Sequence, residues 1–212
     1  MRATAILPVK RFDAAKRRLG ASLSDKRRHE LIEAMLRDVL AAVGASRVVE
    51  RTLVVTGEPA ASAIAAELGA EGVADPADAG HSEAALLGIE AAGAASGCVV
   101  LLPGDCPLLD PRELDRLLTG VPDTYVAVVP DRHGSGTNAL VLSPPTAIRP
   151  AFGEGSRERH VAAARDAGIP YGVEVVGSLA IDLDTPADIV ALTTSLETDR
   201  KRAPNTARAL GI

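Results

Sequence analysis

The sequence predicts a single α/β domain in which helices cover both faces of a mostly parallel sheet. Short apolar runs alternate along the chain with longer stretches of helical periodicity, which is the pattern of strand–helix–strand units. Residues 99–102 are apolar at every position, as expected for a strand that is buried on both faces. The length of 212 residues and the 47% hydrophobic content are sufficient for one substantial core.

Strands are expected wherever β-branched and other apolar residues form a short run that ends at a turn signal. The run at 98–103, CVVLLP, is the clearest case because it contains no charged residue and ends at a proline. In chain order, the expected strands cover residues 4–9, 51–57, 71–75, 98–103, 124–130, 137–143, 171–177 and 179–184.

Helices are expected where apolar residues recur at steps of three and four behind a start signal. In the longest one, apolar residues from Leu31 to Val43 share one face, and Ser24 is the expected N-cap. Asp110 and Ser156 are the expected N-caps of two later helices, and Thr185 opens a capping box for the last. In chain order, the expected helices cover residues 24–45, 58–70, 81–95, 111–120, 157–168 and 186–196.

One domain is expected over 1–197, followed by a polar, loosely held tail over 198–212. The net charge of −5 and the 2% aromatic content argue against a nucleic-acid partner. The two cysteines, Cys98 and Cys106, are too few for a disulfide framework or a zinc site, so a reduced, cytoplasmic protein is expected. The chain has no apolar run of the length of a signal peptide or membrane helix, so no membrane association is expected.

Carboxylates follow two of the expected strands. Asp105 comes just after the strand at 98–103, and Asp182 and Asp184 close the strand at 179–184. Ligands of open α/β sheets bind at the carboxyl ends of strands, and carboxylates that converge there repel unless a hard divalent cation lies between them. We therefore expect these three aspartates to bind Mg²⁺. The alternatives are a structural turn at Asp105 and a simple helix start at the other two.

Basic residues follow the first expected strand. Lys10, Arg11, Lys16, Arg17 and Arg18 lie close together in an otherwise acidic chain. At the carboxyl end of a first strand, such a run can hold a polyphosphate, and we expect Lys16 to reach the α-phosphate of a nucleotide. The alternative is a solvated helix face. The run contains neither the glycine pattern of dinucleotide-binding proteins nor that of P-loop proteins, so neither class is supported.

Two loops rich in glycine and hydroxyl side chains are candidates for anion binding. The loop at 130–136 leads into a strand that begins with Thr137, the expected side-chain contact. A hairpin turn is the alternative for this loop. Gly153 begins a second loop that leads into a helix at Ser156, where unpaired N–H groups attract a phosphate or carboxylate. An ordinary N-cap is the alternative there.

The loop before the helix at 81–95 contains Gly80, His81 and Ser82, which are expected to touch the base or ribose of a nucleotide. His160 is compatible with the core, the surface or a ligand contact, and the role of His133 is equally open.

Five segments, taken together, resemble one known family. In chain order they are LPVKRFDAAKRRL, LLPGDCPLL, DRHGSGTNAL, FGEGSRERH and IDLDTPADI. They resemble the guanylyltransferases of deazaflavin coenzyme (factor 420) biosynthesis, which comprise the phospholactate enzymes of archaea and the phosphoenolpyruvate enzymes of actinobacteria. The resemblance extends from Ile6 to about Leu192. The glycine-rich opening of the wider superfamily is absent, which separates the chain from molybdenum-cofactor and sugar nucleotidyltransferases.

The resemblance implies a Rossmann-like nucleotidyltransferase fold and roles for individual residues. It implies two Mg²⁺ ions when GTP is bound, with Lys16 and Asp105 as the catalytic residues. The implied metal ligands are Asp105, Asp182 and Asp184. The implied acceptor contacts are Thr137, Gly153 and Ser156. Together with the contacts expected above, the nucleotide-binding set is Lys10, Lys16, Arg18, Gly80 and Ser82.

The implied reaction transfers GMP from GTP to the phosphate of phosphoenolpyruvate, which releases pyrophosphate and forms enolpyruvoyl-2-diphospho-5'-guanosine. A homodimer is a further expectation, as is delivery of the product to an enzyme that transfers its phosphoenolpyruvyl group to a deazaflavin alcohol. Phospholactate and 3-phosphoglycerate stay open as acceptors. The remaining alternatives are a nucleotidyltransferase for a sugar or pterin and a non-catalytic nucleotide sensor.

Overall fold

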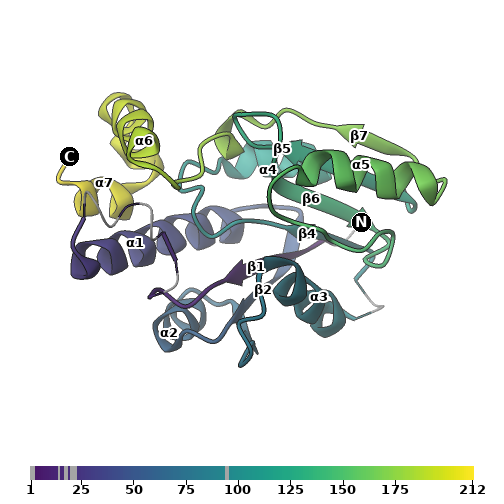
Figure 1. The fold of residues 1–212 in the computed structure, drawn as a ribbon, viewed down its shortest axis with the longest axis horizontal. Helices are drawn as coiled ribbons and strands as arrows, with labels where there is room; N and C mark the ends of the chain where they lie inside the picture. Colours follow the sequence, from purple (N-terminus) through teal and green to yellow (C-terminus); the bar gives the residue numbers. More distant parts are fainter. Residues whose placement is uncertain (1–2, 14, 17–18, 20–22, 94–95) are drawn as a thin grey trace.

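One sheet carries the described strands, in the order β3-β2-β1-β4-β6-β5-β7 (Figure 1). This computed structural model describes residues 3–13, 15–16, 19, 23–93 and 96–212. The strands are β1 (Ala3–Val9), β2 (Val49–Thr56), β3 (Glu71–Ala74), β4 (Cys98–Leu101), β5 (Tyr125–Pro130), β6 (Thr137–Ser143) and β7 (Tyr171–Val173). The pairings of β6 with β4 and β5 are antiparallel and the others are parallel, which confirms the predicted mostly parallel sheet.

Helices cover both faces of the sheet, as predicted. Successive residues of a strand point to opposite faces, so Leu7 of β1 joins one hydrophobic core and Ile6 joins the other. The first core lies under α1 (Asp25–Gly44), α2 (Pro59–Glu67), α4 (Pro111–Leu118), α6 (Pro186–Thr198) and α7 (Pro204–Leu210). The second core lies under α3 (His81–Ala92) and α5 (Ser156–Asp166).

Most helices begin where the sequence predicts, but α5 differs. Side chains cap α1 and α4 at Ser24 and Asp110, and Thr185 opens the capping box of α6. Helix α5 instead has Gly155 as its N-cap, with φ of 68°, and no side chain caps it. The prediction that Ser156 is the N-cap is therefore wrong. Glycine adopts the left-handed conformation freely, so the chain turns one residue earlier and Ser156 already belongs to the first helical turn.

The segment at 179–184 is not a strand, so that prediction is wrong. After β7 the chain forms a 3₁₀ turn (Gly177–Leu179) and then runs to α6 without joining the sheet. Leu179 and Leu183 are fully buried in the first core, which explains the strand-like apolar pattern. The amide of Asn138 donates to the carbonyl oxygen of Leu179 over 2.7 Å, so a side chain holds this segment where a sheet ladder was expected.

The C-terminal residues are folded against α1, contrary to the expected loosely held tail. Asp38 of α1 is 3% exposed, and its two carboxylate oxygens accept hydrogen bonds from Asn205 and Thr206. Each of these residues donates from its backbone nitrogen and its side chain, over 2.7–3.2 Å. A buried carboxylate on another helix thus supplies the acceptors that the start of α7 needs. The polar composition of 198–212 gave no sign of this partner.

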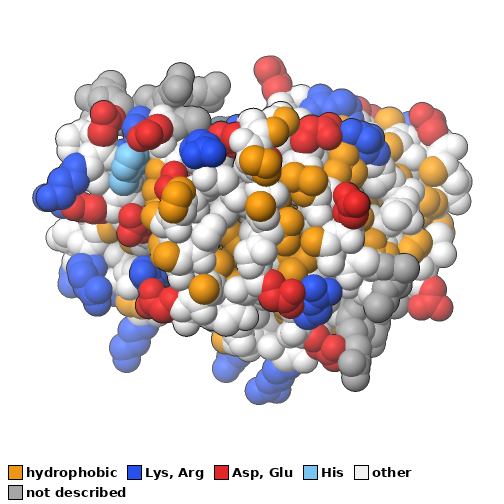
Figure 2. Space-filling view, turned by 90° about the horizontal axis from the view of Figure 1, so that it is seen from below, with side chains coloured by type: hydrophobic (Ala, Val, Ile, Leu, Met, Phe, Trp, Pro, Cys, Tyr) orange, Lys and Arg blue, Asp and Glu red, His pale blue; other side chains and the backbone are white. Residues whose placement is uncertain are grey.

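Figure 2 shows the face on the side of α2 and α3, seen from below. Acidic and basic side chains are interspersed on it, and apolar side chains gather across the middle. None of the described helices is long and apolar enough to cross a membrane.

Candidate active site

A cleft of about 730 Å³ opens where β1 and β4 end, in the middle of the sheet. Its lining includes Lys10 and Lys16 after β1 and Asp105 after β4. Because β6 is antiparallel to β4, the residues that begin β6, Thr137 and Asn138, lie at the same edge. The sheet topology thus brings together residues that are far apart in the sequence.

Most of the predicted site residues line this cleft. Those that do are Lys10, Lys16, Asp105, Thr137, Gly153, Ser156, Asp182 and Asp184. Gly80 and Ser82 do not line it but flank His81, which does. The Ser82 hydroxyl accepts a hydrogen bond from the backbone nitrogen of Phe152, over 2.9 Å. Arg17 and Arg18 lie outside the described residues.

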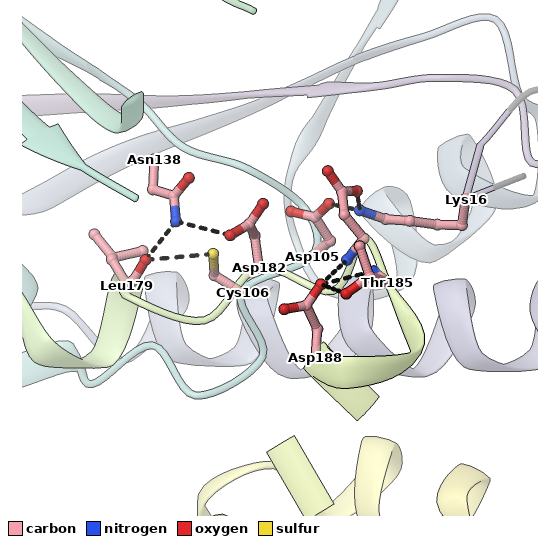
Figure 3. Close-up of polar contacts among 9 residues, drawn as sticks. Lys16, Asp105, Cys106, Asn138, Leu179, Asp182, Thr185 and Asp188 are labelled. Carbon is pink, nitrogen blue, oxygen red and sulfur yellow. Dashed lines mark hydrogen bonds and ion pairs between the residues drawn. The ribbon is translucent and has the colours of Figure 1, made fainter. Parts of the chain in front are cut away.

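The Lys16 ammonium lies between two carboxylates (Figure 3). It donates one hydrogen bond to Asp105 and a second, of 2.6 Å, to Asp184. Because one nitrogen contacts both, the two carboxylates share a single small space, as expected for a common cation site. This arrangement joins the segments after β1 and β4 to the loop before α6.

The electrostatics around Lys16 favour its charged form. Burial alone would lower the pKa of the ammonium, but the charges of Asp105 and Asp184 and the hydrogen bonds to them raise the pKa well above 10.5. Lys16 also has a φ of 55°, in the left-handed region, which costs a residue with a side chain of order 1 kcal/mol. Strain of this kind is common where a side chain must be aimed into a functional site.

Asp182 lies beside the pair but is held by another partner. The amide of Asn138 is 3.4 Å from the Asp182 carboxylate and also donates to Leu179 (Figure 3). Burial, and then the negative charges of Asp105 and Asp184, raise the pKa of Asp182 above 3.8. The three carboxylates are therefore close enough to repel one another, although Asp182 does not contact Lys16.

Asp105 and Asp184 fit a hard divalent cation. Mg²⁺ is commonly held by one or two carboxylates together with substrate phosphates, and this pair of carboxylates already shares one cation. Within the described ranges, no three acidic, histidine or cysteine side chains form a complete metal-ligand group. Asp182 lies beside this pair of carboxylates, with one oxygen towards the amide of Asn138.

A second layer of contacts, which the sequence analysis missed, holds Asp184 in place. One oxygen of Asp188 accepts from the backbone nitrogens of Asp184 and Thr185, over 3.0 and 2.6 Å, and from the Thr185 hydroxyl. Its other oxygen lies 2.5 Å from the guanidinium of Arg132. The capping box at Thr185 was the available signal, but nothing in the sequence pairs Asp188 with Arg132.

Small residues line one wall of the cleft, among them Gly136, Thr137 and Ser156. Asp131 accepts from the backbone nitrogens of Ser135 and Gly136, over 3.1 and 3.0 Å, which folds the loop before Thr137. A side chain at position 136 would meet the Asp131 carboxylate at 2.5 Å, so glycine leaves room here for the carboxylate that holds the turn. Ser156 is 1% exposed and lines the cleft from the first turn of α5.

Aromatic rings pack behind this wall. The Phe152 ring stands edge-on to His81, with centroids 4.7 Å apart, and to His160 at 5.2 Å. Burial lowers the pKa of His81 to about 4; Lys10 and Lys16 add to the effect and Asp105 opposes it. His160 is fully buried and contacts Thr137. His160 follows Ser156 by four residues, so a helix places both side chains on one face. This spacing is the signal in the sequence that could have assigned His160 to the site.

The fold is nucleotidyltransferase-like. A putative nucleotide-diphospho-sugar transferase from Desulfovibrio desulfuricans matches 98% of this chain and 94% of its own, with a TM-score of 0.76 and 16% identity. A Mycobacterium tuberculosis protein, solved in complex with manganese, matches 92% of this chain and all of its own (100%), with a TM-score of 0.59 and 21% identity. Both likenesses concern the fold.

Sequence comparison gives the family. The family model "Guanylyl transferase CofC like" matches residues 3–212, and the chain belongs to this family. It is 44% identical to the phosphoenolpyruvate guanylyltransferase of Conexibacter woesei, over 95% of this chain and 92% of the relative. It is 39% identical to the enzyme of the same name from Sphaerobacter thermophilus, over 91% and 93%. The predicted family and nucleotidyltransferase fold are confirmed.

Proposed function

We propose that this protein transfers GMP from GTP to the phosphate of phosphoenolpyruvate and releases pyrophosphate. The observation that carries the proposal is the convergence of Asp105, Asp184 and Lys16 at the carboxyl ends of the central strands. Relatives at 44% and 39% identity bear the name phosphoenolpyruvate guanylyltransferase, which supports the choice of acceptor.

Asp105 and Asp184 would hold Mg²⁺, and Asp182 is the candidate for a third ligand. Bound there, Mg²⁺ would neutralise negative charge of the two phosphorylated substrates. We extend the proposal to two ions in the complex with GTP. The Mycobacterium tuberculosis protein of similar fold was solved in complex with manganese, which supports the use of a divalent cation by this protein.

The chain's own residues act mainly by neutralising and orienting charge. An oxygen of the acceptor phosphate attacks the α-phosphorus of GTP, an O–P bond forms, and the bond to pyrophosphate breaks. The acceptor needs no strong base, since the second pKa of a phosphate monoester is about 6 and the attacking oxygen already carries charge at neutral pH. Lys16, protonated at any physiological pH, would balance the charge that develops on the triphosphate, assisted by Lys10.

The acceptor would be oriented by the wall of small residues. Thr137, Gly153 and Ser156 line the cleft there and offer hydroxyl and backbone groups to a phosphate or carboxylate. His81, with Gly80 and Ser82 beside it, is the proposed contact for the nucleoside, and Arg18 is proposed as a further phosphate contact.

Direct assay tests the proposal. The purified protein is incubated with GTP or ATP, Mg²⁺ and one of phosphoenolpyruvate, phospholactate and 3-phosphoglycerate, and pyrophosphate and product mass are measured. Release should be fastest with GTP and phosphoenolpyruvate. Asp105→Asn should reduce turnover at least about 100-fold, whereas the control Asp166→Asn at the exposed end of α5 should not. Nucleotide binding without pyrophosphate release from any acceptor would identify a sensor instead.

The proposal also covers the location and the partners of the protein. The thiols of Cys98 and Cys106 are free and buried, which is compatible with a cytoplasmic protein. We also propose a homodimer and delivery of the guanylated product to an enzyme that transfers its phosphoenolpyruvyl group.

A further inference from the structure

His160 lies behind the proposed acceptor site, with both ring nitrogens engaged. Its side chain has no exposed surface. The backbone nitrogen of Ala151 donates to Nε2 over 2.8 Å. Nδ1 is 3.1 Å from the hydroxyl oxygen of Thr137, which lines the cleft. The ring thus connects the segment before Gly153 to the first residue of β6.

These two contacts fix the tautomer of the ring. A backbone N–H can only donate, so Nε2 must carry a lone pair and no proton. A protonated Nε2 would face another donor at 2.8 Å and leave a buried N–H without an acceptor. The single proton of the neutral ring is therefore on Nδ1, and Nδ1 donates to the Thr137 oxygen.

We propose that His160 is a positioning residue that makes Thr137 a hydrogen-bond donor towards the anionic acceptor substrate. Because the Thr137 oxygen already accepts from Nδ1, its own proton is left to point elsewhere, and the cleft is the open direction. A hydroxyl that accepts one hydrogen bond is also polarised to donate a stronger one. The site would then favour an acceptor that presents an oxygen anion at this point.

The surroundings keep this ring in its neutral state. The charge that acts on the ring is that of Arg159, whose guanidinium donates to the carbonyl oxygens of Ala151, Phe152 and Glu154. The other contact is the Phe152 ring, which stands edge-on at 75°. Neither neighbour is an anion that would stabilise an imidazolium.

Two substitutions separate the two hydrogen bonds of His160. In His160→Gln the amide oxygen can replace Nε2 as the acceptor for Ala151, but the donor to Thr137 is lost. In His160→Asn the amide nitrogen can replace Nδ1 as the donor, but the acceptor for Ala151 is lost. We expect His160→Gln to raise the KM for phosphoenolpyruvate about tenfold with the KM for GTP unchanged, as for one lost hydrogen bond to an anion. His160→Asn should be less stable yet keep a lower acceptor KM than His160→Gln.

The inference rests on the proposed acceptor role of Thr137, so Thr137→Val and the double variant with His160→Gln complete the set. If His160 acts through Thr137, the double variant should be no worse than Thr137→Val alone. If the effects of the two single substitutions on the acceptor KM added in the double variant, the inference would be overturned. If Thr137→Val itself leaves acceptor KM unchanged, the proposed acceptor site is wrong instead.

Nitrogen-15 NMR of the histidine rings gives a readout independent of activity. At pH 7 the His160 ring should show a proton on Nδ1 and none on Nε2. A proton on Nε2, or an imidazolium, would overturn the inference whatever the kinetics show.

Discussion

Arg132 and Asp188 join the two sides of the cleft: a guanidinium nitrogen of Arg132 lies 2.5 Å from Oδ1 of Asp188, whose side chain is 5% exposed. Arg132 belongs to the loop between β5 and β6 that leads to Thr137. Asp188 holds the backbone of Asp184 through its other oxygen. The loop of the proposed acceptor contacts and the loop of the proposed metal ligand are therefore fixed relative to each other by one ion pair.

Asp188→Asn should weaken the binding of Mg²⁺, although Asp188 is not a proposed metal ligand. Loss of the charge releases Arg132 and loosens the backbone at Asp184, and changes of this kind behind a metal site cost about 10–100-fold in affinity or activity. The Mg²⁺ concentration for half-maximal activity should rise accordingly. Asp110→Asn, the same change at the N-cap of α4, is the matched control and should leave that concentration unchanged. An unchanged Mg²⁺ dependence in Asp188→Asn would show that the ion pair does not support the site.

Lys16→Met should strengthen metal binding in the absence of nucleotide while it weakens turnover. The Lys16 ammonium contacts the same two carboxylates that we assign to the metal, so a cation must displace it. Without the ammonium, Asp105 and Asp184 repel each other and attract a divalent cation more strongly. We expect Mn²⁺ affinity, measured from free Mn²⁺ by electron paramagnetic resonance, to rise roughly tenfold.

Lys26→Met, at a position on α1 whose side chain is 86% exposed, is the control for this measurement. If Lys16→Met bound Mn²⁺ no more tightly than Lys26→Met, the metal would have to bind away from Asp105 and Asp184.

Ser156→Ala tests the acceptor wall with little structural disturbance. Gly155 is the N-cap of α5, so removal of the Ser156 hydroxyl deletes no capping bond. The KM for phosphoenolpyruvate should rise several-fold, by the loss of one hydrogen bond to a charged group, with the KM for GTP unchanged. Ser62→Ala in α2 is the control, because the Ser62 hydroxyl donates its hydrogen bond to the backbone oxygen of Glu58 at the start of the same helix. An unchanged acceptor KM would remove Ser156 from the site.

Asp38→Ala should release the C-terminal helix. The substitution leaves the buried donors of Asn205 and Thr206 without an acceptor, which should lower the free energy of unfolding by about 2–3 kcal/mol. Residues 204–212 should also become susceptible to limited proteolysis. Asp38→Asn keeps one acceptor oxygen, so its free energy of unfolding should fall by less. If Asp38→Ala unfolded like the wild type in urea, α7 would contribute little to the stability of the fold.

The sequence was most informative where periodicity and caps determine structure locally. Asp105 could be placed because the apolar strand before it has to be central and the residues after a central strand lie at the ligand edge of the sheet. The strand predicted at 179–184 failed because Leu179 and Leu183 are buried by packing, and an alternating pattern does not distinguish packing from sheet pairing. The tail was misjudged because its anchor, Asp38, lies far away in the chain.

The supporting contacts of the site could not be predicted for the same reason. Asn138 with Asp182, Arg132 with Asp188 and His160 with Thr137 are pairs whose members lie well apart in sequence or on different elements. Asp182 and Thr137 could be predicted as site residues, but nothing in the sequence pairs them with Asn138 and His160. The antiparallel placement of β6 beside β4 brings Thr137 and Asn138, at the start of β6, to the edge of the sheet where the cleft opens.

Acid should destabilise the protein through His160 before most carboxylates titrate. Burial, with a smaller effect of Arg159, lowers the pKa of His160 from 6.5 to about 4. The unfolded chain therefore takes up a proton as the pH falls through 6.5, and the folded protein does so only near 4, so stability is full above 6.5 and is lost between these values. By linkage, about 2 kcal/mol of the free energy of unfolding should be lost through this ring between pH 7 and pH 5.

Urea unfolding at both pH values tests this. The free energy of unfolding should fall by about 2 kcal/mol less in His160→Gln, which has no ring to protonate, than in the wild type. Equal drops in the two proteins would mean that the ring is not held neutral, and the assignment of its proton to Nδ1 would fail with it.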